Sequence, residues 1–370
     1  MGSAQARIGL SMGMLIAILL CVAGVTNASG GELLQRGPRA PNGAAAVLDS
    51  LGVLQPESVR SILLLYSGKS LLKSKTEELE ADLRKSPENI ESRLMLVGYY
   101  TWNARSALEH LRLRAHVLWM IENHPEHAAT AEPSLRELAD DPDGNEKILD
   151  LWTKNLQSRA DDLAVLKNAE KFFFGRNPAE ADLLIHRISE REPNNREWAN
   201  ELAQLYRMFG IPGENFEDHA ARALEAYRRV LELTKNPAAR QALPGEMADA
   251  AFKIGDFPAA AELAKVYLKS SDRPAVQRAN TILGRVALRT GDIAQAKQYL
   301  LDSADPRAAR DIAFSGPTLI LAKELIEQGE RDAVLEYLED CLQLWPRGEN
   351  VLRIWIADIK NGRTPSFGGP

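Results

Sequence analysis

The sequence predicts an all-α protein in which pairs of antiparallel helices stack side by side as an α-solenoid. Four glycines each separate two amphipathic helical segments: Gly210, Gly255, Gly291 and Gly329. The last three are 36 and 38 residues apart, which is the length of one helix–turn–helix unit. Such a unit is too small to bury its own apolar face, so neighbouring units must cover each other. Aromatic residues make up only 6% of the chain, and alanine and leucine are abundant, which suits close-packed helices.

The N-terminus has the pattern of an export signal. Arg7 supplies a positive charge, and residues 8–25 are almost free of polar groups. Thr26 and Ala28 then occupy positions −3 and −1 of a signal-peptidase site before Ser29. We therefore predict that residues 1–28 are a signal peptide and that the protein is exported to the periplasm or cell envelope.

Two alternatives to a cleaved signal peptide remain open at this stage. The apolar run is just long enough to span a bilayer as an uncleaved membrane anchor. Cys21 offers a site for lipidation, although Ile18, Leu19 and Leu20 lack the small residue that lipid attachment favours directly before the cysteine. Either alternative would make the protein a membrane-tethered assembly factor.

Composition and cysteine count exclude several classes of protein. The net charge is −6 and the pI is about 5.7, which gives no basic footprint for nucleic acid. Cys21 and Cys341 are the only cysteines in the sequence, so a chain without its leader has no internal disulfide and no thiolate zinc site. We predict no cofactor and no metal.

The first part of the chain after the leader is less regular. Residues 29–43 are rich in glycine and proline and predict a flexible linker. Helical patterning begins near Ala44 and defines a divergent N-terminal helical region over residues 44–158. Within it, residues 128–145 predict a short helix and an acidic loop, and residues 145–162 predict a further helix.

The later segments repeat one packing pattern. Leu283, Gly284 and Ala287 form an apolar stripe, Gly291 breaks the helix, and Ala296 begins the next stripe. Small residues belong where two helices cross most closely, because only glycine or alanine lets the backbones approach. In the last repeat the same classes of residue fall on Leu321, Ala322, Leu325, Gly329, Val334, Leu338, Cys341 and Pro346.

At these offsets the chain resembles the tetratricopeptide repeat (TPR) family. The resemblance covers roughly residues 90–350, with a TPR-like array over residues 159–360, one degenerate repeat before it and a C-terminal tail over residues 361–370. Arg176 and Ala104 stand where the family has a turn glycine, and an insertion of about eight residues follows Gly210.

The resemblance implies where a partner binds, because the first helix of each TPR pair lines a concave groove. Its exposed positions map onto Asn200, Gln204, Arg207, Asp249, Lys253, Arg278, Arg285, Arg289 and Lys323. Most of these residues are basic in a chain that is acidic overall. We therefore predict a protein or peptide partner, with an acidic or C-terminal carboxylate segment as one hypothesis. The alternative is that helix surfaces simply carry lysine and arginine.

No motif predicts catalysis. His124 and His127 are three residues apart with a proline between them, which does not fit a metal pair on a helix. The loop at Asp141 and Asp143 resembles a calcium loop in part, but it supplies too few oxygens and indicates a helix cap instead. We predict a non-catalytic binding scaffold. The alternative is an all-α envelope enzyme of a polysaccharide-processing type, whose pair of carboxylates the sequence does not reveal.

Overall fold

The computed structural model describes residues 56–367, and every regular element in this range is a helix. The predicted all-α class is therefore confirmed. The predicted signal peptide, the linker over residues 29–43 and the start of helical patterning near Ala44 lie outside the described residues. Between residues 56 and 367, no helix combines the length and the apolar character needed to cross a bilayer.

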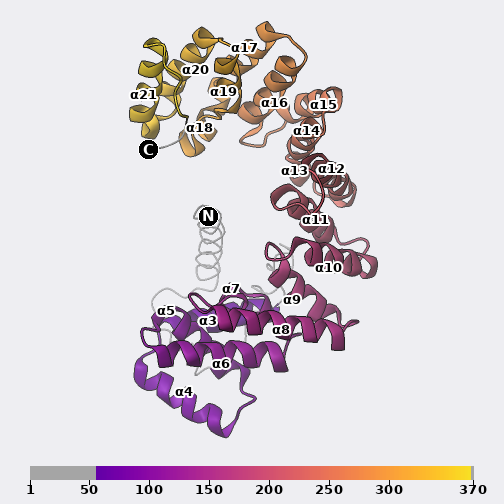
Figure 1. Cartoon of the computed structure of the whole chain (residues 1–370), viewed down its shortest axis with the longest axis vertical. Coiled ribbons are helices and arrows are strands. Elements are labelled where there is room, and N and C mark those ends of the chain that lie inside the picture. Colours follow the sequence, from indigo (N-terminus) through magenta and orange to yellow (C-terminus); the bar gives the residue numbers. More distant parts are fainter. Residues whose placement is uncertain (1–55, 368–370) are drawn as a thin grey trace. The chain divides into compact units, whose positions relative to one another are not determined.

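The chain divides into two units, with the boundary between Phe172 and Phe173 (Figure 1). Unit 1 comprises the residues up to Phe172, and unit 2 begins at Phe173. The boundary lies at the end of helix α9 (Leu163–Phe173), one helix after residue 158, where the sequence pattern changes.

Unit 1 is built around one central helix, α5. It contacts α3, α4, α6 and α7, and α6 contacts α8 in turn. The elements are α3 (Pro56–Lys69), α4 (Lys73–Lys85), α5 (Ile90–Asn103), α6 (Ala107–Asn123), η1 (Ala128–Ala131), α7 (Pro133–Arg136), α8 (Pro142–Ser158) and α9.

Helices α3 and α5 cross at two glycines. A Cβ atom at Gly98 would lie 1.9 Å from the backbone oxygen of Leu65, and one at Gly68 would lie 2.1 Å from the backbone oxygen of Met95. The two backbones therefore approach as closely as glycine alone allows. This crossing fixes the separation of α3 and α5.

A group of buried polar side chains joins α4, α5 and α6. Arg93 and His116 are 7% and 6% exposed, and Nη1 of Arg93 lies 3.2 Å from Nδ1 of His116. Oε1 of Glu80 lies 3.2 Å from Nε2 of the same histidine and accepts a hydrogen bond from the Tyr100 hydroxyl at 2.8 Å. The Arg93 guanidinium also stacks on the ring of Trp119, 3.6 Å from its centroid. This polar group therefore connects α4, α5 and α6.

The acidic loop before α8 is a helix cap, as predicted. The Asp141 side chain accepts a hydrogen bond from the backbone N–H of Gly144 at 3.0 Å and binds the Arg114 guanidinium with both oxygens. Helix α8 begins at Pro142, three residues before the predicted start, because proline fits the first turn of a helix. It ends at Ser158, earlier than the predicted end at residue 162.

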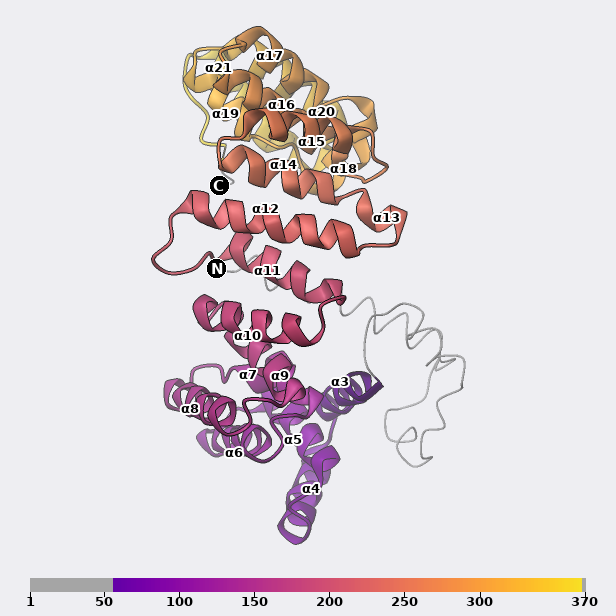
Figure 2. The ribbon, with the colours of Figure 1, turned by 90° about the vertical axis from the view of Figure 1, so that its right-hand side faces the viewer.

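In unit 2, helices that are neighbours in the chain are also neighbours in space (Figure 2). Helix α11 packs on α12, α12 on α14, α14 on α15, α15 on α16 and α16 on α17, and α17 and α19 both pack on α20. The elements are α10 (Pro178–Arg191), α11 (Arg196–Met208), α12 (Phe216–Leu233), α13 (Pro237–Arg240), α14 (Leu243–Lys253), α15 (Phe257–Leu268), α16 (Ala275–Arg289), α17 (Ile293–Asp302), η2 (Pro306–Ala308), α18 (Ala309–Ser315), α19 (Ile320–Glu327), α20 (Arg331–Leu344), η3 (Pro346–Gly348) and α21 (Glu349–Lys360).

The turns of unit 2 use the glycines that the sequence singled out. Gly210, Gly255, Gly291 and Gly329 have φ angles of +66°, +78°, +84° and +89°. Residues with side chains rarely adopt this left-handed conformation, which ends a helix. The turn after α9 also has such a glycine, Gly175 with φ of +114°, one residue before the predicted turn position at Arg176. That repeat departs from the pattern by one residue rather than lacking a turn glycine.

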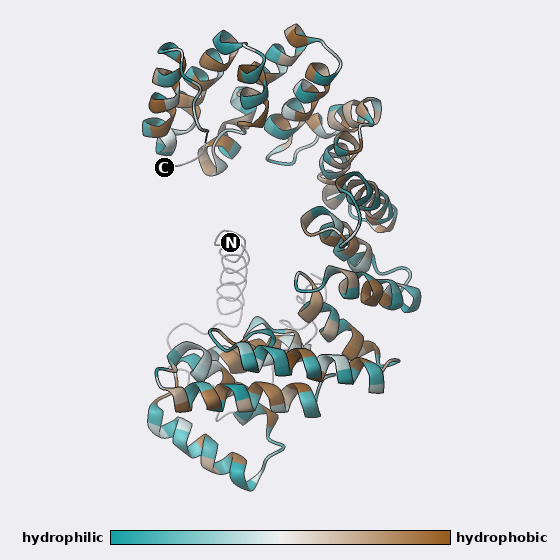
Figure 3. Ribbon diagram, in the orientation of Figure 1, coloured by the Kyte–Doolittle hydropathy of each residue, from teal (hydrophilic) through white to brown (hydrophobic). Residues whose placement is uncertain are grey.

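The predicted packing positions of unit 2 form its cores. Leu321, Ala322, Leu325, Val334, Leu338 and Cys341 are all fully buried. At the close crossing, a Cβ atom on Gly284 would lie 2.2 Å from Cδ2 of Leu321. Burial raises the pKa of the Cys341 thiol to about 12, which fits the predicted inert core cysteine. Figure 3 shows apolar and polar residues alternating along these helices, as one-sided burial requires.

The predicted C-terminal tail is irregular over its described part but lies against the last helices. The ring of Phe367 packs edge-on against Trp355, with centroids 5.4 Å apart. Nη1 of Arg331 donates a hydrogen bond to the backbone oxygen of Arg363 at 2.9 Å. Residues 361–367 therefore cover part of the core between α20 and α21.

Candidate functional site

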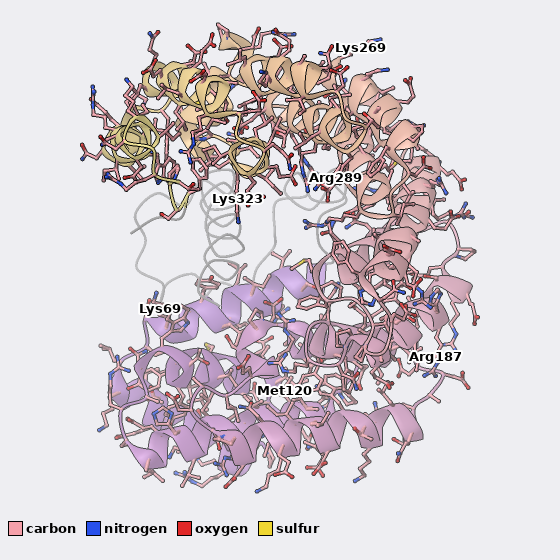
Figure 4. All side chains as sticks on the ribbon, turned by 45° about the horizontal axis from the view of Figure 1, so that its top comes forward. Lys69, Met120, Arg187, Lys269, Arg289 and Lys323 are labelled. Atoms are coloured by element: carbon pink, nitrogen blue, oxygen red, sulfur yellow. The ribbon has the colours of Figure 1, made fainter. Side chains whose placement is uncertain are left out.

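The nine predicted groove residues lie on four helices of unit 2. We call this set the first-helix face, because α11, α14, α16 and α19 are the first helices of four successive pairs. Arg207, Arg289 and Lys323 are exposed, and the other members are partly buried. In Figure 4, Arg289 and Lys323 lie on one side of unit 2, whereas Lys269 lies on the other.

A bidentate ion pair joins α16 to α14 on this face. Nη1 and Nη2 of Arg278 bond the two carboxylate oxygens of Glu246 at 2.7 and 2.9 Å. Burial alone would raise the pKa of Glu246, but its bonds and charge attraction to Arg278 outweigh burial and hold that pKa below its usual value. Arg278, predicted as a contact for a partner, is thus already engaged within the protein.

A second carboxylate joins α16 to α19. Nε of Arg285 lies 3.1 and 3.2 Å from the oxygens of Glu324, and Nη2 of Arg289 lies 3.0 Å from the first of them. The Arg285 guanidinium also stacks 4.2 Å from the ring centroid of Phe252 on α14. Two arginines share one carboxylate here, so this cluster keeps an excess positive charge.

The remaining members differ in how they are engaged. Nζ of Lys253 lies 2.8 Å from Oδ2 of Asp249, one helical turn away. Arg207 donates two hydrogen bonds to the amide oxygen of Gln204, at 3.1 and 2.7 Å. Within residues 56–367, neither Arg207 nor Lys323 forms an ion pair with a carboxylate. Asn200 is partly buried on α11.

The balance of charge on this face follows from these pairs. Its six cations face three carboxylates, namely those of Asp249, Glu246 and Glu324. The face therefore remains net positive even when Glu327, exposed one turn after Lys323 on α19, is counted as a fourth carboxylate, in a chain whose formal net charge is −6. The surplus lies at Arg207, around Glu324 and at Lys323.

A pocket opens beside this face between α11, α12 and α14, with a volume of about 140 Å³. We call it the α11–α14 pocket. Its lining combines aromatic rings, small residues and charged groups: Tyr206, Arg207, Met208, Phe209, Gly210, Phe216, His219, Ala220, Ala223, Tyr227, Glu246, Asp249, Ala250 and Lys253.

The connection between α11 and α12 shapes one wall of the pocket. The backbone N–H of Ile211 donates a hydrogen bond to Nε2 of His219 at 2.8 Å, which ties the connection to α12. A Cβ atom on Gly210 would lie 2.1 Å from the His219 ring, and its φ is +66°. Glycine is therefore required at this position for two independent reasons.

The sequence did not identify Glu246, Glu324, Phe209 or Phe216 as part of this site. Glu246 lies one turn before Asp249, and Glu324 directly follows Lys323. Both glutamates reach arginines of the neighbouring helix pair. The two aromatic residues flank the inserted segment after α11. The sequence did contain one signal for them, namely the insertion after Gly210 with a phenylalanine near each end.

No protein-family model matches the chain, and a search of curated proteins gives no match.

Proposed function

We propose that this protein is a non-catalytic scaffold of the α-solenoid, TPR-like type, exported to the cell envelope, which binds a peptide or protein segment along the first-helix face. The fold part of this proposal is supported by the repeated sequence register, the left-handed turn glycines and the order of helix contacts in unit 2. Helix pairs that pack in chain order leave their first helices on a common face, which is the arrangement that repeat proteins use for binding.

The observation that carries the binding proposal is the net positive charge of that face. The cross-helix ion pair with Glu324 holds the exposed Arg289 in place beside Arg285, so the side-chain entropy of Arg289 is already lost before a partner arrives. Arginines positioned in this way form bidentate contacts with carboxylates. An acidic polypeptide segment fits this face better than a basic one.

Affinity capture from an envelope extract tests the proposal. The bait is the purified protein, compared with a double variant, Arg289→Glu with Lys323→Glu, and with Lys269→Glu on the opposite side of unit 2. We expect mass spectrometry to find a partner with the wild type and with Lys269→Glu, and to lose it with the double variant. Equal capture by all three proteins would remove the charged face from the proposal.

Two further measurements address the fold and the location. A compact globule of 370 residues has a radius of gyration of about 21 Å. We expect small-angle X-ray scattering to give a larger value, because an open array of helix pairs is extended. N-terminal sequencing of exported protein should begin at Ser29 if the leader is cleaved.

A further inference from the structure

The α11–α12 connection differs from the equivalent connections in unit 2. Seven residues, 209–215, join α11 to α12, whereas three residues join α14 to α15, α16 to α17 and α19 to α20. The longer connection holds four of the about eight residues inserted in the sequence, and the others extend the start of α12. It lies at the mouth of the α11–α14 pocket. The pocket is therefore bordered by a segment that these other helix pairs lack, and a binding role for it rests on the proposed function.

Large apolar side chains surround the mouth of the pocket and remain exposed. Met208 is 51% exposed, Phe209 45% and Phe216 62%. The rings of Phe209 and Phe174 pack edge to face with centroids 5.7 Å apart, which steadies one side of the mouth. Exposed apolar groups that cluster around a cavity mark a binding site more often than a random surface does.

The interior of the pocket has room for one side chain. Three small residues leave the space open, Ala220, Ala223 and Ala250, and the rings of Tyr206 and Tyr227 contribute to its walls. A cavity of about 150 Å³ is large enough to hold benzene. The pocket of about 140 Å³ therefore accommodates a single ring or a leucine-sized group.

The charges that line the pocket balance each other. Glu246 is bound by Arg278, and Asp249 is bound by Lys253. Arg207 lies at the exposed rim and is held by Gln204. Because both carboxylates already have cationic partners, the interior favours an uncharged side chain over a lysine or an arginine.

We propose that the α11–α14 pocket binds one large apolar side chain of an extended acidic peptide, whose carboxylates lie toward Arg289 and Lys323. Neighbouring packed helices are about 8–10 Å apart, and an extended chain advances about 3.3 Å per residue. The steps from α14 to α16 and from α16 to α19 therefore correspond to about three residues each. The carboxylates lie about three and six residues from the apolar anchor.

A library of random twelve-residue peptides displayed on phage tests this proposal. Selection on the immobilised protein should enrich peptides that carry one aromatic or leucine residue with glutamate or aspartate at about the third and sixth residues beyond it. The highest-ranked peptide is then synthesised with a fluorescent label, and its Kd is measured by anisotropy. Replacing its anchor with alanine, or its carboxylates with amides, should weaken binding about tenfold or more.

Two matched pairs of variants locate the binding. Phe216→Ala should weaken binding of the selected peptide about tenfold, whereas Phe314→Ala, which removes a side chain 70% exposed on α18, should leave the Kd unchanged. Arg289→Glu should weaken binding, whereas Lys269→Glu should not. All four positions are exposed, so we expect each variant to fold. Circular dichroism and thermal melting check this for each variant.

The outcomes separate this inference from the proposed function. Failure to enrich any peptide family would contradict peptide binding itself and remove both. Two results would overturn the claim that the pocket binds an apolar side chain, while leaving peptide binding on the first-helix face intact. In the first, the selected peptides lack a shared large apolar residue. In the second, they bind the Phe216→Ala variant as tightly as the wild type.

Discussion

Units 1 and 2 are both made of helices, but different interactions hold them together. The described part of unit 2 has left-handed glycines in its turns and small apolar residues at its helix crossings. Unit 1 also has glycines at one crossing, that of α3 and α5, but it connects its helices through a buried polar group of Arg93, His116 and part of Glu80. Its turn after α5 has Ala104 with φ of −59° in place of a left-handed glycine.

This contrast indicates that a periodic sequence and a polar core are alternative ways to specify helix packing. In unit 2 most crossings repeat the same local rule, so many weak signals agree, and a buried polar contact between Gln277 and Asp311 is added to them. In unit 1 a few side chains from distant positions must find one another, and each has a specific partner. We therefore expect single changes to cost more in unit 1 than equivalent changes in unit 2.

The largest expected difference concerns the crossing glycines. Gly98→Ala places a methyl group against the backbone of Leu65 and should destabilise unit 1 by about 3 kcal/mol or more. Gly284→Ala overlaps the end of the Leu321 side chain and lies 3.2 and 3.3 Å from Cβ of Tyr299 and the backbone oxygen of Ala296. Because its closest neighbour is a side-chain end rather than backbone, it should cost less, about 1–2 kcal/mol. Hydrogen exchange followed by mass spectrometry measures the loss of unfolding free energy in each unit. Equal losses would contradict the expectation that single changes cost more in unit 1.

The second prediction uses a buried carboxyl group of unit 1. Burial raises the pKa of Glu132 to about 7, and the attraction of Arg136 opposes this only in part. The unfolded chain releases this proton near pH 4.5, so the folded form loses stability as the pH rises from about 4.5 to 7. Glu132→Gln should therefore stabilise the protein by up to about 3 kcal/mol at pH 8 and have little effect at pH 4.

Melting temperatures at the two pH values measure this effect. Glu77→Gln, at an exposed position on α4, is the matched control and should show no comparable gain at pH 8. A Glu132→Gln variant that is no more stable than the wild type at pH 8 would show that this carboxylate is ionised at no cost.

The third prediction concerns the cross-helix ion pairs of unit 2. Glu246→Gln leaves the partly buried Arg278 without its carboxylate and should destabilise unit 2 by about 1–2 kcal/mol. Glu262→Gln, which breaks an exposed pair with Lys265 on α15, should produce no measurable change in urea denaturation. If Glu246→Gln and Glu262→Gln have the same free energy of unfolding, the ion pair between Glu246 and Arg278 does not stabilise unit 2.

The smallest expected effect is a pH dependence in unit 2. The neighbouring Asp182 raises the pKa of His186, so this pair stabilises the fold below about pH 6.5 and the gain disappears as the pH rises through the raised pKa. The histidine side chain is 56% exposed, and solvent screening limits the gain to under about 0.5 kcal/mol. His186→Gln should flatten the stability profile between pH 6 and 8, which urea titrations at several pH values can measure. A His186→Gln profile as steep as that of the wild type would assign the dependence to another group.

Much of unit 2 could be predicted because its signals are local. A glycine that follows an apolar stripe predicts a helix end from residues within one turn of it, as at Gly255 and Gly291. Burial of Leu321, Ala322 and Leu325 follows from helical periodicity alone. The polar group of unit 1 gave no such signal, because Glu80, Arg93 and His116 share no spacing that sequence reasoning recognises.

The candidate site was predictable only in part. The helical register placed Arg285, Arg289 and Lys323 on the same kind of position, and the structure brings the two arginines to one carboxylate. The register did not predict that Glu246 would bind Arg278, or that Glu324 would bind Arg285 and Arg289. That outcome depends on how far one helix is rotated and shifted against the next.

Short stretches of sequence were enough to define the helical class, the turns of unit 2 and the residues that pack between its helices. These features depend on chemistry within a few neighbouring residues. Only the packed helices define which charges of the first-helix face are paired, and only they show that an inserted segment beside α12 borders a pocket. Such features arise where side chains from separate helices meet, and their distances are set by packing that no single segment encodes.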